Sequence, residues 1–373
     1  MSRPAVAVFT DTYLPTVNGV TYTVQTWRDR WVDRGGRMDV VYPASDHEPD
    51  AGEFPVRSLP FPFYDGFRAG LPTVPRGATD VDLVHAHTPF ALGLGARRLA
   101  RREDVPLVAS YHTPTAEYAN YVADGWLGDV VERAATGWER WYMNRVDAVV
   151  VPSAPARERL RDDGVTAEIE VVPNGVDTDF FAPDADAAAA FRDRHDLPGD
   201  DPLVGYTGRH GYEKRLSDLL RAAEGLDATV VLGGDGPARA DLEDLAETVD
   251  ADVRFLGFLD RADLPAFYAS LDVFAFPSPV ETQGLVALEA NACGTPVAGV
   301  DAGALSETIQ AGETGYKARA GDTGAFRDVI ERTLADREDL RGHCLDHRAE
   351  IGVDHAVDRL EEVYEGVLAR QRP

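Results

Sequence analysis

The sequence contains little lysine, little cysteine and no long apolar run. Lys214 and Lys317 are its only lysines, and Cys293 and Cys344 are its only cysteines. Two cysteines allow at most one disulfide and exclude a cysteine-based metal framework, so we expect free thiols in a reducing compartment. No segment approaches the roughly 18 apolar residues of a membrane span, and the N-terminus lacks the apolar core of a signal peptide. We therefore expect a cytoplasmic protein, soluble or peripheral to the membrane.

Acidic residues are abundant instead. The 373 residues include 64 acidic and 37 basic ones, a formal charge of −27. Such a charge repels phosphate backbones, which excludes nucleic acid as a general partner. Acid excess with almost no lysine is typical of salt-loving microbes such as halophilic archaea, in which internal salt screens self-repulsion. A GC-rich genome would explain the lysine deficit but not the acid excess, so we expect this chain to need molar salt.

Short apolar runs alternate with helix-length segments along the whole chain. Runs lie at 4–9, 38–42, 83–86, 107–111 and 148–151, and the rhythm restarts at 203. This pattern predicts α/β architecture, with two doubly wound parallel sheets in tandem. A segment rich in Pro, Asp and Ala, at 173–201, marks the boundary. We predict domains at 1–178 and 179–352, and a C-terminal helix at 353–373 that packs back on the first domain.

Two strand-to-helix connections carry residues suited to phosphate. Gly19 lies just before the first predicted helix, whose N-terminal amides can bind an anion, although a tight turn explains the glycine equally well. The segment is not a GxGxxG dinucleotide motif. Arg209 and Lys214 follow the first strand of the second half, where ligands of open α/β sheets bind. Both can hold a diphosphate. The alternative is ordinary surface charge, which is less persuasive because one of only two lysines lies here.

The segment FPSPVETQGLVALEANACGTPVAG predicts an extended loop followed by a helix that begins near Gly284. Glu281 would lie in the loop and Glu289 in the helix, while the amides around Gly284 and Leu285 offer a second phosphate site. A glutamate in a mostly apolar helix is costly to bury unless it meets a polar ligand such as ribose hydroxyls. An exposed glutamate on an amphipathic helix is the alternative.

Histidines follow two of the predicted strands. His112 comes at the carboxyl end of the apolar strand 107–111, where it could bond sugar hydroxyls or serve only a structural role. His85 and His87 form a similar pair. We predict no metal site, because no third ligand accompanies them.

Together these segments resemble the retaining glycosyltransferases of the GT-B fold, family 4. The resemblance covers nearly the whole chain and rests on DTYLPTVNGV, HAHTPF, SYHT, PNGVD, GRHGYEKR, GDGP and ETQGLVALE, a form of the family's E-x7-E motif. It implies two Rossmann-like domains facing across a cleft, with the acceptor on the N-terminal domain and the nucleotide sugar on the C-terminal domain. It also implies an enzyme that moves a hexose from a UDP- or GDP-linked sugar to a hydroxyl, with no cofactor or metal required.

The resemblance assigns roles to individual residues. His112 and Glu281 would be the catalytic residues, both at the donor sugar, with His112 lining a sugar site between the domains. The implied donor-binding residues are Gly19, Arg209, Lys214, Thr282, Gly284, Leu285 and Glu289, with the Arg and Lys on the diphosphate and the last on the ribose. Many members have Phe-Gly after the first motif glutamate, where this chain has Thr282-Gln283-Gly284. That form resembles the diacylglycerol glucosyltransferase and lipid mannosyltransferase subgroup, so the expected acceptor is a membrane lipid or a lipid-linked glycan.

The acceptor side is expected in the N-terminal half, which is the less acidic one. The acceptor candidates are Tyr13, Thr16, Phe63 and Tyr64, the last two in the aromatic loop 61–67. Basic residues cluster at 97–102. We predict that this cluster and the aromatic loop support peripheral contact with the inner face of the membrane. In the alternative, the arginines pair with nearby acids and the aromatic side chains pack inward.

Two functions of other classes remain open. One is a sugar-nucleotide epimerase of the same fold, which would need no acceptor. The other is a noncatalytic nucleotide-sugar-binding module. The ETQGLVALE motif and the long aromatic loop argue against the epimerase, and the full set of site residues argues against the module.

Overall fold

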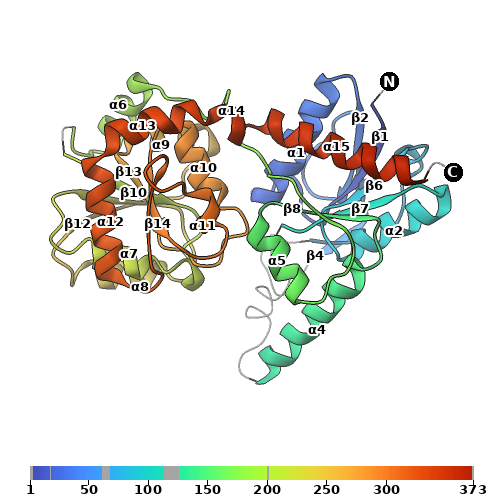
Figure 1. Cartoon of the computed structure of the whole chain (residues 1–373), viewed down its shortest axis with the longest axis horizontal. Helices are drawn as coiled ribbons and strands as arrows, with labels where there is room; N and C mark the ends of the chain where they lie inside the picture. The colour runs from blue at the N-terminus through green and yellow to red at the C-terminus, as the bar shows by residue number, and fades with distance from the viewer. Residues whose placement is uncertain (1–2, 17, 61–67, 113–125, 200, 372–373) are drawn as a thin grey trace. The chain divides into compact units, whose positions relative to one another are not determined.

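A computed structural model describes residues 3–16, 18–60, 68–112, 126–199 and 201–371 (Figure 1). The chain forms two compact units, one made of Met1–Asn174 with Val353–Pro373, the other of Gly175–Gly352. The first boundary therefore lies a few residues before the predicted position 178. The C-terminal helix α15 (Val353–Gln371) belongs to the first unit, where it contacts α1 (Gly19–Asp33).

The first unit is built on a seven-stranded sheet with the order β3-β2-β1-β6-β7-β8-β9. All neighbours in this sheet are parallel. Its strands are β1 (Ala5–Phe9), β2 (Arg37–Pro43), β3 (Glu53–Val56), β6 (Leu83–Ala86), β7 (Leu107–Ser110), β8 (Ala148–Val151) and β9 (Ile169–Val171). A separate antiparallel pair is formed by β4 (Ser58–Pro60) and β5 (Arg68–Gly70). The remaining elements are α2 (Ala91–Glu103), α4 (Trp126–Met143), α5 (Ala154–Asp162) and the 3-10 turn η1 (Arg76–Ala78).

Both faces of this sheet are covered by helices. Along β1, Val6 and Val8 pack with α1 and α15, whereas Ala7 and Phe9 pack with α2, α4 and α5. Figure 1 shows the two groups of helices on opposite sides of the strands. The two-residue period of a strand sends successive side chains to opposite faces, so a strand buried on both faces is apolar throughout. Trp27 on α1 is fully buried.

The second unit contains a six-stranded parallel sheet with the order β12-β11-β10-β13-β14-β15. Its strands are β10 (Leu203–Thr207), β11 (Thr229–Gly233), β12 (Asp252–Gly257), β13 (Val273–Phe276), β14 (Val297–Val300) and β15 (Gly315–Ala318). The helices are α6 (Ala185–Arg194), α7 (Leu216–Ala222), α8 (Arg239–Ala246), α9 (Leu264–Ser270), α10 (Leu285–Ala292), α11 (Leu305–Thr308), α12 (Thr323–Ala335), α13 (Arg337–Asp346) and α14 (Arg348–Ile351). Two 3-10 turns, η2 (Tyr212–Lys214) and η3 (Arg261–Asp263), complete the unit.

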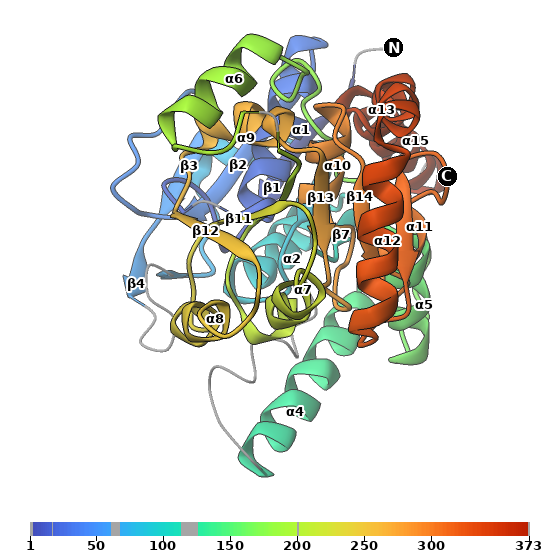
Figure 2. The same cartoon turned by 90° about the vertical axis from the view of Figure 1, so that its left-hand side faces the viewer.

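Helices α6, α9 and α10 gather on one side of these strands, and α7 and α8 on the other (Figures 1 and 2). The predicted fold class, two doubly wound parallel sheets, is thereby confirmed. In each sheet the strand order reverses once, between β1 and β6 and between β10 and β13. The carboxyl ends of strands at such a reversal form the usual ligand crevice of open α/β sheets. The loops that follow these four strands therefore define where a site belongs.

Candidate active site

The loops after β10 and β13 bring two of the predicted site residues into contact. Lys214, at the end of η2, places its Nζ 2.7 Å from Oε1 of Glu281, which follows β13. Arg209 lies earlier in the same loop and pairs with the Glu213 carboxylate. Both cations proposed for a diphosphate thus face a carboxylate at the strand reversal of the second unit. Carboxylate and phosphate oxygens compete for the same N–H donors, so this arrangement suits anion binding.

Helix α10 begins where the sequence predicts. Gly284 precedes its first residue, Leu285, and adopts the left-handed conformation with φ 79°. A β-carbon at this glycine would lie 2.8 Å from Cδ2 of Leu305, so a larger residue would be strained by the positive φ and would have to displace the end of that leucine side chain. The helix begins without a side-chain cap. Its first-turn amides carry partial positive charge near Thr282 and Glu281, which fits a phosphate site.

Glu289 lies inside α10 and is partly buried. The Tyr268 hydroxyl donates a hydrogen bond of 2.7 Å to its Oε2. Burial raises the pKa of the Glu289 carboxyl, while the bond from Tyr268 and the charge of Arg261 act in the opposite direction. The Tyr268 hydroxyl is therefore one of the polar partners expected for a glutamate in a mostly apolar helix. Sequence reasoning missed Tyr268, which carries no motif.

A buried histidine connects two loops of the second unit. The ring of His210 donates through Nε2 to the Gly233 carbonyl at 3.2 Å, and its backbone N–H donates to the Asp235 carbonyl at 2.8 Å. The Ala238 N–H donates to the His210 carbonyl at 2.9 Å. The GDGP segment packs so closely that a β-carbon at Gly234 would collide with the neighbouring loop's backbone. His210, next to Arg209, therefore joins the loop after β10 to the loop after β11 through hydrogen bonds.

The loop after β1 in the first unit is held by its own polar side chains. Asn18 caps α1 by accepting a 2.9 Å bond from the Thr21 N–H, and Gly19 is the first residue of that helix. Asp11 accepts a 2.5 Å bond from the Thr88 hydroxyl and a 3.2 Å bond from the Leu92 N–H of α2. Burial raises the pKa of Asp11 to about 6 despite these bonds. The two loops at this strand reversal are therefore joined through Asp11.

The four residues expected to bind the acceptor substrate do not form a common site in the described part of the chain. Tyr13 is buried, and its hydroxyl donates to Oε1 of Glu53 at 2.8 Å, so that hydroxyl does not present itself to an acceptor. Thr16 is partly buried, and its N–H bonds the Tyr13 carbonyl. Phe63 and Tyr64 lie outside the described residues. Sequence reasoning missed Glu53 as the partner of Tyr13, because no local spacing connects the two residues.

Three histidines meet at the carboxyl ends of β6 and β7. Nδ1 of His87 lies 2.8 Å from Nε2 of His112, and the two rings are nearly parallel. His85 packs against His87 with ring centroids 4.3 Å apart. Burial lowers the pKa of each: to about 3 for His85, to about 4 for His112, and well below its ordinary value for His87. All three imidazoles are therefore neutral near pH 7, and sequence reasoning did not foresee that His87 touches His112.

The basic cluster of α2 is only partly neutralised by acids. Arg102 pairs with Glu103 at 2.8 Å, as the alternative interpretation expects for all four arginines. Arg97 instead lies over the Trp141 ring, 5.1 Å from its centroid. No ion pair is recorded for Arg98 within the described ranges, and it is exposed. The cluster therefore retains positive charge at the surface.

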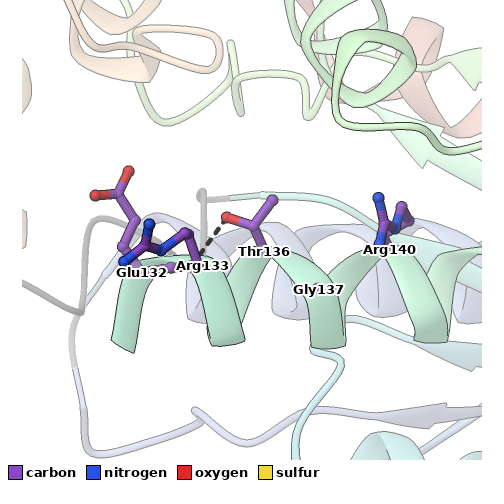
Figure 3. A pocket seen from close by; sticks show the side chains of 5 residues that line it. All are labelled: Glu132, Arg133, Thr136, Gly137 and Arg140. Atoms are coloured by element: carbon purple, nitrogen blue, oxygen red, sulfur yellow. Dashed lines mark hydrogen bonds between the residues drawn. The ribbon is translucent and has the colours of Figure 1, made fainter. Parts of the chain in front are cut away.

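A surface hollow on α4 is lined by none of these residues. It has a volume of about 350 Å³ and runs along α4 (Figure 3). Its lining residues are Glu132, Arg133, Thr136, Gly137 and Arg140. All five lining residues belong to this one helix, and no residue predicted for the site is among them. Among residues 3–371 as far as they are described, no group of three or more His, Cys, Asp or Glu side chains could hold a metal ion. Nor does this part of the chain contain a helix with the length and apolar character to cross a membrane.

Comparison with known proteins places this arrangement in a class. Residues 17–180 match the model of Glycosyltransferase Family 4, and residues 188–345 match that of Glycosyl transferases group 1. A sucrose-phosphate synthase of Thermosynechococcus elongatus has a similar structure, with a TM-score of 0.79 and 22% identity over 98% of this chain and all of that one. An Anabaena protein in complex with UDP gives a TM-score of 0.75 at 19% identity, covering 97% of this chain and all of that one. The two-unit fold is thus that of the GT-B glycosyltransferases.

Sequence relatives agree with this assignment. A GDP-mannose-dependent alpha-mannosyltransferase of Mycolicibacterium smegmatis is 33% identical over 83% of both chains. An alpha-monoglucosyldiacylglycerol synthase of Streptococcus pneumoniae is 27% identical over 96% of this chain and 85% of that protein. The sulfoquinovosyl transferase SQD2 of Arabidopsis thaliana is 33% identical over 76% of this chain, which spans only 56% of that protein.

This chain belongs to the family 4 glycosyltransferases, and it is a glycosyltransferase enzyme. The resemblance inferred from the sequence motifs is confirmed. Neither alternative function, the epimerase or the noncatalytic module, is supported by these relatives.

Proposed function

We propose that this protein is a retaining hexosyltransferase that uses a UDP- or GDP-sugar and glycosylates a membrane lipid or a lipid-linked glycan. The observation that carries the proposal is the contact of Lys214 with Glu281 at the strand reversal, beside Arg209 and the start of α10. Relatives named for GDP-mannose and for a glucosyldiacylglycerol support the donor and acceptor classes.

The donor diphosphate would replace the carboxylates as partner of Arg209 and Lys214, with the α10 amides near Gly284 and Leu285 as further donors. When the sugar–phosphate bond breaks, negative charge grows on the diphosphate. Positive groups held in place by the fold stabilise that charge without reorganisation, which is usually the largest catalytic contribution. These groups offer the neutralisation that a divalent cation supplies elsewhere, so the proposed reaction requires no metal or other cofactor.

The remaining roles concern the sugar and the ribose. Release of Lys214 to the diphosphate would leave Glu281 free to contact the donor sugar, assisted by Thr282. Glu289, with Tyr268 on one oxygen, would accept a bond from a ribose hydroxyl through the other. Neutral His112 would bond a sugar hydroxyl, and Gly19 would let the α1 backbone approach the diphosphate. The acceptor hydroxyl would attack on the face that the diphosphate leaves, with a phosphate oxygen taking its proton.

We further propose that the first unit binds the acceptor and the inner face of the membrane. The observation behind this is the basic surface of α2, where a hollow of about 200 Å³ is lined by Leu94, Arg97, Arg98 and Arg101. Basic residues near an anionic leaflet contribute about 1 kcal/mol each at physiological salt. At molar salt this attraction is screened, so aromatic side chains of the segment 61–67 would carry most of the attachment.

The test is incubation of the purified protein with labelled UDP- and GDP-sugars and extracted lipids in molar salt. Label in a lipid product with retained anomeric configuration supports the proposal. An epimerised nucleotide without transfer, or donor binding without turnover, would contradict it. The Arg209→Ala, Lys214→Ala double variant should fold and lose turnover, while Lys317→Ala serves as control because this other lysine contacts Ser306 and Asp301 instead.

A further inference from the structure

The three histidines at the carboxyl ends of β6 and β7 form a connected row rather than three separate contacts. The His87 and His112 rings are joined by the 2.8 Å nitrogen–nitrogen contact, with 9° between their planes. The His85 ring packs against the His87 ring, with 31° between their planes. A hydrogen bond to Asn174 also holds the His112 side chain. The row therefore ends on the one histidine for which a catalytic role is proposed.

The hydrogen bond between His87 and His112 forms only if one of the two bonded nitrogens carries a proton and the other does not. A neutral imidazole carries one N–H and one bare nitrogen, so two rings that share a nitrogen–nitrogen hydrogen bond must use one as donor and the other as acceptor. Burial keeps both rings neutral, as their lowered pKa values indicate. The tautomers of His112 and His87 are therefore coupled, because a proton on one of the two bonded nitrogens requires the other nitrogen to be bare.

His87 is itself firmly held. Its backbone N–H donates to the Phe9 carbonyl at 2.8 Å, and its ring packs at 62° to that of Trp27 with centroids 5.6 Å apart. The Trp27 indole N–H in turn donates to the Asn174 carbonyl at 2.7 Å. A side chain so restrained can fix the orientation of the ring bonded to it.

We propose that His87 is a positioning residue for sugar transfer: it sets the rotamer and the tautomer of His112 through the Nδ1–Nε2 hydrogen bond. The inference rests on the proposed function, because it concerns the histidine assigned to the donor sugar. His87 touches no substrate in this scheme. It acts only through the His112 ring, on which a sugar hydroxyl would take the place of Asn174 as the second hydrogen-bond partner.

Two substitutions separate this role from simple packing. In His87→Asn the amide lies where Nδ1 lies in histidine and can still bond His112, whereas in His87→Gln the longer side chain places its amide where Nε2 lies. By analogy with outer partners that orient metal-bound histidines, His87→Gln should lower kcat at least about tenfold. His87→Asn should stay close to wild type, and neither change should alter the Kd for UDP or GDP.

His85 supplies the matched control. It is equally buried in the same row, but its nitrogens bond Tyr364 at 2.6 Å and Ser110 at 2.8 Å, not His112. His85→Asn and His85→Gln should therefore lower the thermal midpoint without a difference in kcat between them. Packing alone does not predict that kcat differs between the Asn and Gln variants at position 87 but not between those at position 85.

A second measurement does not depend on how well a variant folds. Nitrogen-15 spectra of histidine-labelled wild-type protein at pH 7 should show His87 and His112 each in one tautomer, with only one of the two bonded nitrogens protonated. Mixed tautomers at His112 would overturn the inference. So would equal kcat values for His87→Asn and His87→Gln while His112→Ala is inactive. Full activity of His112→Ala, or no transfer by wild type, would instead overturn the proposed function and this inference with it.

Discussion

Removal of the Lys214 ammonium tests the proposed site most directly. In Lys214→Ala the diphosphate loses one fixed cation, which by comparison with other preorganised electrostatic donors costs about 2–4 kcal/mol of transition-state stabilisation. That range corresponds to a loss of about 30- to 900-fold in kcat/KM. The folded state should lose less. The Lys214 and Glu281 side chains are only 21% and 13% exposed, so removal of the lysine leaves a largely buried carboxylate without its partner and should cost about 1–3 kcal/mol of stability.

The assay compares Lys214→Ala with Lys317→Ala in molar salt. The control lysine is 19% exposed and also faces a carboxylate, Asp301 at 3.5 Å, so the two changes remove similar groups from the same unit. Donor turnover, UDP and GDP affinity, and urea unfolding would be measured for both. Equal kcat/KM for the two variants would refute the diphosphate assignment. A fall in kcat/KM that is fully explained by the unfolded fraction of Lys214→Ala under the assay conditions would show that the lysine serves the fold and not the reaction.

Three further predictions follow from other contacts. Glu281→Gln should lower turnover more than nucleotide affinity, whereas Glu289→Ala should weaken binding of free UDP or GDP, and equal losses by titration calorimetry would contradict this division of roles. Because the pKa of Asp11 rises from 3.8 to about 6 on folding, its ionisation destabilises the protein by at most about 3 kcal/mol as pH increases from about 4 to 6. Asp11→Asn should remove that decline from urea unfolding curves, and an unchanged pH dependence would reject the assignment. In vesicle flotation, wild type should bind lipid at molar salt and a variant with serine at the three phenylalanines of segment 61–67 should not; wild type that stays at the bottom would favour a soluble acceptor.

The sequence by itself determined the architecture and the family. Strands such as β1 and β10 are apolar on both faces, and this pattern is local, so it predicts parallel sheets before any contact is known. The start of α10 after Gly284 can also be predicted from the local sequence. Glycine adopts the left-handed conformation readily, so it often stands at the boundary between a loop and a helix. The motifs that carry the resemblance are short and lie in the loops after strands, so they too could be recognised from the sequence.

Only the tertiary structure decided which of these residues touch. Lys214 and Glu281 are 67 positions apart and meet because β10 pairs with β13, although β11 and β12 intervene along the chain. The His87–His112 bond likewise depends on β6 lying beside β7, and no spacing within either strand predicts a shared proton. Tyr13, an acceptor candidate by sequence, is committed to Glu53 because β2 places β3 within its reach. Side-chain pairing across a sheet is set by strand order, which is a property of the whole fold and not of any one segment.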